Sequence, residues 1–163
     1  MGLFANLFVR GEPVLSDAAS RDAAAIAALH AASFRRGWSE QEVEGLLTDR
    51  HVIAHRAMLG STMVAFILSR LVEDEAEILS VAVARARRGR GLARNLLDLH
   101  LRRLAGYGAR AVFLEVDEHN TAAIRLYDRA GFREVARRPS YYPGAGGKAA
   151  AALVLRRDLV RRA

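Results

Sequence analysis

The stretch over residues 81–94 has the residue types and spacing of a binding site for a phosphate-bearing ligand. It reads VAVARARRGRGLAR: an apolar run, then arginines interrupted by Gly89 and Gly91, then the start of an amphipathic helix. Glycine lets backbone N–H groups approach a ligand closely. The unpaired amides at a helix N-terminus attract anions together with the helix dipole. The stretch therefore predicts an anion site but leaves the ligand open.

Two common phosphate-binding motifs do not match the chain. A Walker A loop places two glycines at a fixed spacing before Lys-Ser/Thr, but Lys148 is followed by Ala149, and Tyr142 stands at the first glycine position. A dinucleotide fingerprint requires a third glycine at position 94, which is Arg94, and an acidic residue about twenty positions further on, where the chain reads LAGYGA. The Walker A interpretation therefore fails, and the dinucleotide interpretation is weak.

The composition is that of a globular protein without cysteine chemistry. The chain has 163 residues, of which 52% are hydrophobic and 26% charged, enough to bury the core of one domain. It has no cysteine, which excludes disulfides, cysteine metal ligands and a cysteine acyl-enzyme. The five histidines form no paired helical ligand motif, so we expect no metal. The net charge is +7, but the arginines crowd one loop, and we expect no direct nucleic-acid partner.

The N-terminal segment, residues 1–10, reads MGLFANLFVR, which is apolar but short and lacks a basic leader. We expect it to be flexible or loosely packed, ahead of a single domain over residues 11–163. No run in the chain approaches the length of a membrane span. We therefore expect a cytoplasmic protein without a membrane partner.

Hydrophobic periodicity predicts the elements that would hold residues 81–94. Ser20 is a candidate N-cap for a helix over residues 22–33, and Ser39 with Glu42 forms a capping box that begins a helix over 40–47. Asn120 begins a helix that ends at Gly131. Strands are expected over 13–16, 51–58, 62–71, 76–83, 111–117, 133–138 and 149–157, and a further helix over 92–105. The pattern predicts an α/β fold with a mixed sheet, in which 76–83, 92–105 and 111–117 form a parallel, right-handed crossover.

A series of motifs along the chain resembles the GCN5-related N-acetyltransferase (GNAT) superfamily. The sequence RGRGLA at 88–93 is similar to the family pattern Arg/Gln-x-x-Gly-x-Gly/Ala, which cradles the pyrophosphate of coenzyme A, and it follows a Val-Ala-Val strand. Downstream lie LEV at 114–116, NTAAI at 120–124, LY at 126–127, GF at 131–132 and YYP at 141–143. With WSE at 38–40, this ordered series resembles the ribosomal-protein-alanine N-acetyltransferase (RimI) branch.

The resemblance implies the GNAT fold and its cofactor contacts. That fold is α/β, with a mixed, mostly antiparallel central sheet of about six or seven strands and about four flanking helices. The sheet splays between the strands at 76–83 and 111–117. Acetyl-CoA is the implied co-substrate, with strand amides at 81–83 binding the thioester oxygen and loop amides binding the pyrophosphate. The implied cofactor-binding residues are Val81, Ala82, Val83, Arg88, Gly89, Arg90, Gly91, Leu92, Ala93, Arg94 and Asn120.

Two further residues match the family's catalytic groups. Glu115 matches the general base, acting directly or through a water, and Tyr127 matches the general acid that protonates the leaving thiolate. Because the chain has no cysteine, the implied route is direct transfer to a primary amine within a ternary complex. Without the resemblance, Glu115 would be an ordinary strand-end glutamate, Tyr127 a core tyrosine and Asn120 only an N-cap.

The RimI branch implies that the acceptor partner is the N-terminal alanine amine of a small-subunit ribosomal protein, with Trp38 and Tyr141 lining the acceptor groove. The chain departs from the branch where Asp-Pro is frequent, because it has Ala84 and Arg85 there. It departs again where acidic residues are frequent near the acceptor, because it has alanines at 149 and 150. The second departure leaves the acceptor open.

Two alternatives to a protein acceptor follow. One is a GNAT enzyme that acetylates a small-molecule amine, such as a polyamine or an antibiotic, for which Glu73, Asp74 and Glu75 are the available acidic cluster. The other is a non-catalytic coenzyme A-binding module, against which the presence of both Glu115 and Tyr127 argues.

Overall fold

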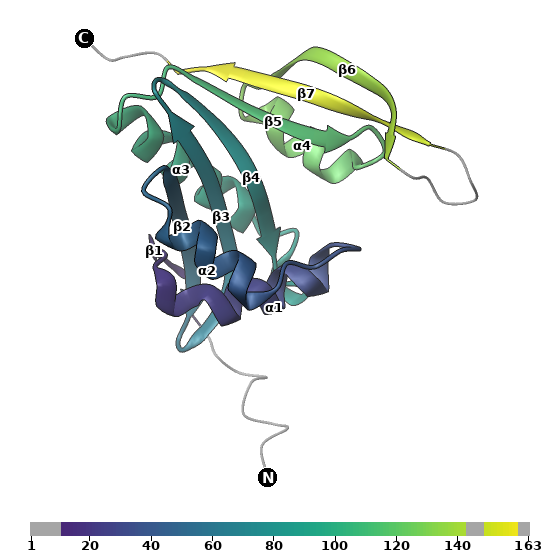
Figure 1. Ribbon diagram of the computed structural model, residues 1–163. Helices are drawn as coiled ribbons and strands as arrows, with labels where there is room; N and C mark the ends of the chain where they lie inside the picture. Colours follow the sequence, from purple (N-terminus) through teal and green to yellow (C-terminus); the bar gives the residue numbers. More distant parts are fainter. Residues whose placement is uncertain (1–10, 143–148, 160–163) are drawn as a thin grey trace. The chain divides into compact units, whose positions relative to one another are not determined.

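The computed structural model describes residues 11–142 and 149–159, which form a seven-stranded mixed sheet with four α-helices (Figure 1). The strand order is β1-β2-β3-β4-β5-β7-β6. The strands are β1 (Val14–Asp17), β2 (Val52–Leu59), β3 (Thr62–Val72), β4 (Glu75–Val83), β5 (Ala111–Asp117), β6 (Arg133–Tyr142) and β7 (Ala150–Asp158). The helices are α1 (Ala23–Ser33), α2 (Glu40–Thr48), α3 (Leu92–Gly106) and α4 (Thr121–Arg129), with short 3-10 turns η1 (Ser20–Asp22) and η2 (Arg85–Arg87). The α/β fold class is confirmed.

The chain divides into two compact units. Within the described residues, the first unit holds 11–68 and 80–96, and the second holds 69–79 and 97–159. Strands β3 and β4 and helix α3 each contribute to both units. The predicted connection from β4 through α3 to β5 is parallel, because residues 75–77 pair in parallel with residues 111–113. The splay further along these two strands stays a prediction.

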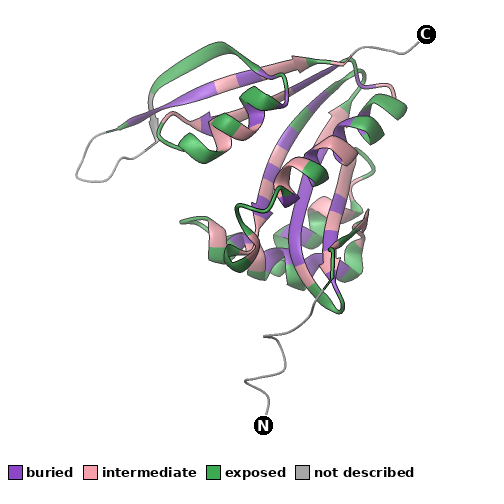
Figure 2. Cartoon of the chain, turned by 180° about the vertical axis from the view of Figure 1, so that it is seen from behind, coloured by how far each residue is buried: buried purple, intermediate pink, exposed green. Residues whose placement is uncertain are grey.

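The core of the first unit forms around α1 and β3. The buried residues of α1 are Ala23, Ile26, Ala27 and His30, whose spacing gives one helical stripe. Residues 64–68 of β3, reading VAFIL, are all buried, as expected for a strand covered on both faces. Helix α2 packs on α1 and β2, and Figure 1 shows it lying across β2 and β3. Figure 2 shows the exposed residues on the outward sides of the helices.

The start of α1 differs from the prediction. Ser20 is not the N-cap, because it lies inside η1 and Asp22 stands at the N-cap of α1. The Asp22 side chain makes no cap bond to α1; instead, the Ala19 N–H donates to Asp22 Oδ2 at 2.8 Å. The Asp22 carboxylate is buried and also pairs with Arg56 on β2. This long-range partner compensates the burial of the carboxylate, which the local sequence pattern does not reveal. The capping box of Ser39 and Glu42 is confirmed, with both bonds present.

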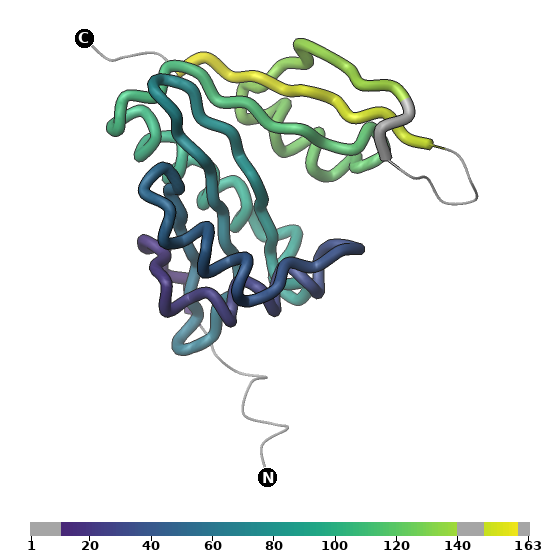
Figure 3. The backbone as a smooth tube through the Cα atoms, viewed as in Figure 1, coloured from purple at the N-terminus to yellow at the C-terminus, as the bar shows by residue number. Residues whose placement is uncertain are grey.

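The second unit contains an antiparallel arrangement of β5, β7 and β6 that can be followed along the tube in Figure 3. Strand β5 pairs with β7 from Ala111↔Asp158 to Asp117↔Ala152. Helix α4 lies beside β5 and β7 in Figure 1, and Arg157 of β7 donates from Nη1 to the carbonyl of Ala130 at 2.6 Å. Gly131, with φ +87°, ends α4 as predicted.

Candidate active site

The predicted anion site is a strand, a turn and a helix start within the first unit. Strand β4 ends at Val83, and the Ala84 N–H then donates to the Val64 carbonyl at 2.8 Å, which anchors the turn to β3. The glycine loop, residues 88–91, leads into α3. Gly89 and Gly91 have φ values of +77° and +79°, and a Cβ built on either would meet nothing within 4 Å. Glycine is therefore required for backbone conformation rather than for space.

The start of α3 offers backbone amides that are suited to an anion. The first helical bond of the turn runs from the Asn95 N–H to the Gly91 carbonyl at 3.0 Å. The amides of Leu92 and Ala93 come before that bond, so they have no intrahelical acceptor. The side chains of Ala82 and Leu92 are buried, so only their backbone groups are suited to a ligand. The burial of these side chains is thus consistent with the prediction that this stretch binds its ligand through backbone groups.

The arginines of the stretch are mostly exposed, and one of them supports the loop. Arg88 donates from Nε to the Val83 carbonyl at 2.9 Å, which folds its side chain back to the end of β4. Arg87 and Arg90 line a pocket of about 170 Å³ that also includes residues of the segment before β1. This volume is below the range of roughly 300–1,000 Å³ typical of sites for whole organic ligands. The pocket suits a small group rather than an entire coenzyme.

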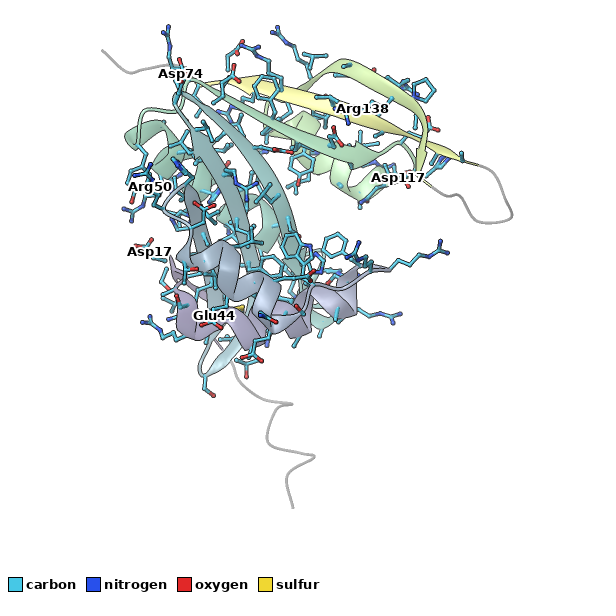
Figure 4. The ribbon with its side chains drawn as sticks, in the orientation of Figure 1. Asp17, Glu44, Arg50, Asp74, Asp117 and Arg138 are labelled. Atoms are coloured by element: carbon cyan, nitrogen blue, oxygen red, sulfur yellow. The ribbon has the colours of Figure 1, made fainter. Side chains whose placement is uncertain are left out.

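Glu115 lies on β5 in the second unit. Buried Leu114 and Val116 point to one face, and half-buried Glu115 lies on the other, which confirms the predicted alternation. The Glu115 side chain is 27% exposed, and its Oε1 lies 3.2 Å from Nη1 of Arg138 on β6. Figure 4 labels Arg138 on this part of the sheet. The predicted base is therefore accessible and carries a cationic partner that the sequence did not identify.

Tyr127 is buried in α4 and 7% exposed. Its ring meets the Phe132 ring edge to face, with centroids 5.4 Å apart, and its carbonyl accepts from the Phe132 N–H at 3.0 Å. Burial raises the pKa of Tyr127 to about 12. The phenol therefore keeps its proton across the neutral range, as a proton donor must. Tyr127 also packs in the core, as we expected for this residue without the resemblance.

Asn120 is the N-cap of α4, as predicted, and its Oδ1 accepts from the Ala123 N–H at 3.3 Å. The turn before it is fixed by Glu118, which the sequence did not single out. Glu118 Oε1 accepts from the Ala151 N–H at 3.0 Å, and Oε2 lies 2.8 Å from Nη1 of Arg137. The Ala151 hydrogen bond lowers the pKa of Glu118, and the nearby His119 and Arg137 add to this. Glu118 thus ties the β5–α4 turn to β7.

Trp38 packs against a buried histidine, His30, which could not be identified as its partner from the sequence. Its backbone N–H donates to Nδ1 of His30 at 3.0 Å, and the two rings stack at 4.1 Å with an interplanar angle of 8°. Phe34 lies 4.4 Å from the His30 ring on another side. Burial lowers the pKa of His30, although Glu42 opposes the shift. A neutral imidazole with an unprotonated Nδ1 is what the Trp38 hydrogen bond requires.

The predicted site residues divide between the two units. The predicted coenzyme residues 81–94 and Trp38 belong to the first unit, whereas Glu115, Asn120 and Tyr127 belong to the second. Tyr141 lies in β6, one residue before the strand ends at Tyr142. The side chain of Tyr141 lies outside the described part of the chain, as do Pro143 and residues 144–148. The functional roles of all these residues stay predictions.

Metal and membrane features are not found in the described residues. No group of three or more His, Cys, Asp or Glu residues there could hold a metal ion. Within the same part of the chain, every helix is too short or too polar to cross a membrane.

Comparison with known proteins identifies the family. The model of the acetyltransferase (GNAT) family matches residues 23–132. The chain therefore belongs to the GNAT family of acetyltransferases and is an N-acetyltransferase.

Two similar relatives share one name. The ribosomal protein bS18-alanine N-acetyltransferase of Salmonella typhimurium is 36% identical over 110 residues, which cover 68% of this chain and 74% of that enzyme. The enzyme of the same name from Escherichia coli K12 is 34% identical over 111 residues, with the same coverage.

Solved structures agree on the fold. The crystal structure of the ribosomal-protein-S18-alanine N-acetyltransferase from Escherichia coli matches with a TM-score of 0.85 at 26% identity, covering 93% of this chain and 96% of that one. Arabidopsis thaliana NAA60 in complex with acetyl-CoA matches with a TM-score of 0.79 at 19% identity, over 90% of this chain and 98% of that one, which is a likeness of fold. The predicted GNAT fold is confirmed.

Proposed function

We propose that this N-acetyltransferase uses acetyl-CoA to acetylate the N-terminal alanine amine of a small-subunit ribosomal protein. The observation that carries the proposal is the 36% identity, over 110 residues, to an enzyme named for that reaction on bS18. The TM-score of 0.85 to the Escherichia coli enzyme of the same kind supports it.

The residues of the first unit fit a pyrophosphate. The two left-handed glycines turn the backbone so that the loop carries no side chain at positions 89 and 91, where a ligand can approach. The amides of Leu92 and Ala93 add donors at the positive end of α3. Bound acetyl-CoA would supply a thioester with an electrophilic carbonyl carbon and a sulfur leaving group. Strand amides at 81–83 are the proposed donors to the thioester oxygen.

Glu115 is the proposed general base. An N-terminal amine has a pKa near 7.7–8.0, so much of it is protonated at neutral pH and must lose a proton before it attacks. The Glu115 carboxylate takes that proton directly or through a water, and the nitrogen keeps the electron pair that forms the new bond. The 27% exposure of Glu115 leaves it accessible to an amine from solution.

Tyr127 is the proposed donor to the departing thiolate. Its pKa of about 12 is well above the value near 8.5 of a free thiol. Moving the proton fully from the free-protein phenol to a thiolate would therefore cost about 5 kcal/mol, at about 1.4 kcal/mol per pKa unit. A hydrogen bond from the phenol to the sulfur, which stabilises its developing charge, does not carry that cost.

A small-molecule amine is the second candidate acceptor. The observation in its favour is a pocket of about 560 Å³ in the second unit. Its lining includes the acidic residues Glu73, Asp74, Glu75 and Glu77 beside Phe113, a composition that suits a cationic amine.

One experiment separates the acceptors. The purified protein is incubated with acetyl-CoA and either peptides that begin with alanine or small polyamines, and the products are read by mass. Addition of one acetyl group to the alanine amine, and not to a peptide with a blocked N-terminus, is the expected result. Transfer to small amines alone would replace the first proposal with the second. Coenzyme binding without any transfer would contradict both proposed acceptors.

A further inference from the structure

Strand β6 carries two adjacent arginines with different partners. Arg138 places Nη1 3.2 Å from Glu115 Oε1. Arg137 places Nη1 2.8 Å from Glu118 Oε2 and Nη2 3.1 Å from Glu134 Oε1. The two side chains are similarly exposed, at 57% and 50%. Their different partners therefore come from the direction in which each side chain points.

A bulge in β6 decides which arginine faces Glu115. Before it, Glu134 pairs with Leu155 of β7, and after it Ala136 pairs with Val154, so one extra residue lies between them. Beyond the bulge Arg138 pairs with Ala152, while Glu115 of β5 pairs with Val154. Residues 152 and 154 share one face of β7, so Arg138 and Glu115 share it too. Without the extra residue, Arg137 would take this position.

The space between Arg138 and Glu115 is kept open by a small residue. Ala152 pairs with Arg138 on one side and with Asp117 on the other, and it is completely buried. Its methyl group lets the arginine reach diagonally across β7 to β5. Asp117, in the same row, is already engaged, because its Oδ1 accepts from the His119 N–H at 2.8 Å. The register therefore brings Arg138 to Glu115.

We propose that Arg138 is a positioning residue for Glu115, whose carboxylate it fixes through Oε1 so that Oε2 is presented to the acceptor amine. This inference rests on the proposed role of Glu115 as general base. A carboxylate has two oxygens and about four acceptor positions, so an arginine on one oxygen does not use up the other. In the proton transfer, an N–H bond of the ammonium breaks and an O–H bond forms on Glu115.

Chemistry gives the base a reason to have such a partner. A charge-assisted hydrogen bond restricts a carboxylate to one orientation, so that the oxygen left free can face the acceptor amine. The charged strand residues on the face of Glu115 are Arg133 and Arg138 on β6, Arg156 and Asp158 on β7, Asp117 on its own strand, and Glu75 and Glu77 on β4. Arg133 is engaged with Asp158 at 3.5 Å. Arg156 is engaged elsewhere, 5.1 Å over the Phe113 ring and 2.8 Å from Asp158.

The first test asks whether Arg138 holds the Glu115 carboxylate without any substrate. Carbon-13 NMR at pH 7 records the glutamate carboxyl signals, and Glu115→Gln assigns the signal of Glu115. In Arg138→Gln the chemical shift of that signal should change, because the charge-assisted hydrogen bond to Oε1 is lost. Arg138→Lys should keep the signal closer to its wild-type position. Arg137→Gln, on the opposite face, is the matched control and should leave the signal in place.

The second test links the pair to turnover. Arg138→Gln should lower kcat by about 3–10-fold and leave the KM for acetyl-CoA unchanged, since a single cationic group at a partly exposed site has a modest effect. Arg138→Lys should restore most of kcat. Combined with Glu115→Gln, Arg138→Gln should add no further loss, because a residue that acts through Glu115 has nothing to act on once the carboxylate is gone.

The outcomes separate this inference from the proposed function. If Arg137→Gln shifts the Glu115 carboxyl signal as far as Arg138→Gln does, the effect is one of surface charge and the inference is wrong. An Arg138→Gln loss that adds in full to that of Glu115→Gln overturns it as well. If Glu115→Gln turns over like wild type, the base assignment itself fails. If Glu115→Gln is inactive and Arg138→Gln is normal in both tests, only the inference about Arg138 fails.

Discussion

The glycine loop in the first unit and the Glu115 face in the second reach their chemistry by different means. In the loop, residues 88–91, the proposed function depends on backbone conformation, and two neighbouring glycines with left-handed φ determine that conformation. At Glu115, the proposed function depends on a side chain whose partner, Arg138, comes from another strand and faces it only because of a bulge. Local sequence therefore specifies the first region, whereas strand register specifies the second.

The largest effect is expected from a substitution in the second region alone, at Glu115. Glu115→Gln keeps the size and hydrogen-bonding shape of the side chain but removes the base, so kcat should fall by about 10²–10⁴-fold. The affinity for acetyl-CoA, measured by calorimetry, should stay near the wild-type value because the glycine loop is untouched. A loss of coenzyme affinity equal to the loss of turnover would show that the two regions are not separate in function.

Tyr127→Phe should lower kcat by about 10²-fold, the lower end of the range for acid–base groups, because the phenol acts by hydrogen bonding. Tyr127→Phe should also change how the free energy of unfolding depends on pH. The folded-state pKa of about 12 lies above the unfolded value near 10, so the unfolded state loses its proton first. The wild-type protein should therefore lose about 2–3 kcal/mol relative to Tyr127→Phe between pH 10 and pH 12, and nothing below pH 10.

Urea unfolding of both proteins at a series of alkaline pH values gives that difference, and other titrating groups cancel in the comparison. A constant difference across the series would contradict the burial of the phenol. A variant with normal kcat would instead remove Tyr127 from the reaction.

Gly91→Ala tests the first region and should be milder. No atom lies within 4 Å of the added Cβ, so the cost comes from the left-handed backbone, at about 1–2 kcal/mol. That corresponds to a rise in the KM for acetyl-CoA of about 5–30-fold, with kcat nearly unchanged. Gly45→Ala in α2 is the matched control, because its Cβ also meets nothing and its φ is not left-handed. If Gly45→Ala raised that KM equally, the loop geometry would not be the cause.

The same contrast explains what the sequence could predict. The capping box at Ser39, the N-cap at Asn120 and the glycine at 131 each depend on residues within a few positions, and each prediction is confirmed. The Ser20 cap was wrong because a 3-10 turn over Ser20–Asp22 precedes α1 and puts Asp22 at its N-cap. The partner of Glu115 could not be predicted, because a bulge changes the face of every later residue in β6 without a clear local signal.

His30 shows the same limit in the first unit, since its place below Trp38 depends on how α1 and the following loop pack. It also predicts the smallest effect, which is a pH dependence of stability. Burial lowers the pKa of His30 in the folded state below its unfolded value near 6.5, so the unfolded state binds the proton more readily as the pH falls. Stability from this residue is therefore complete above pH 6.5 and declines below it.

His30→Asn is the sharpest probe, because asparagine offers an oxygen acceptor to the Trp38 N–H but does not titrate. The free energy of unfolding of wild type, minus that of His30→Asn, should be constant above pH 7 and should shrink from pH 6.5 to pH 5. His51 is exposed, so His51→Asn is the matched control for the substitution itself. A difference for His30→Asn that does not change with pH would mean that the Trp38 hydrogen bond does not require a neutral imidazole. The cluster of His30, Phe34 and Trp38 would then hold its loop by stacking alone.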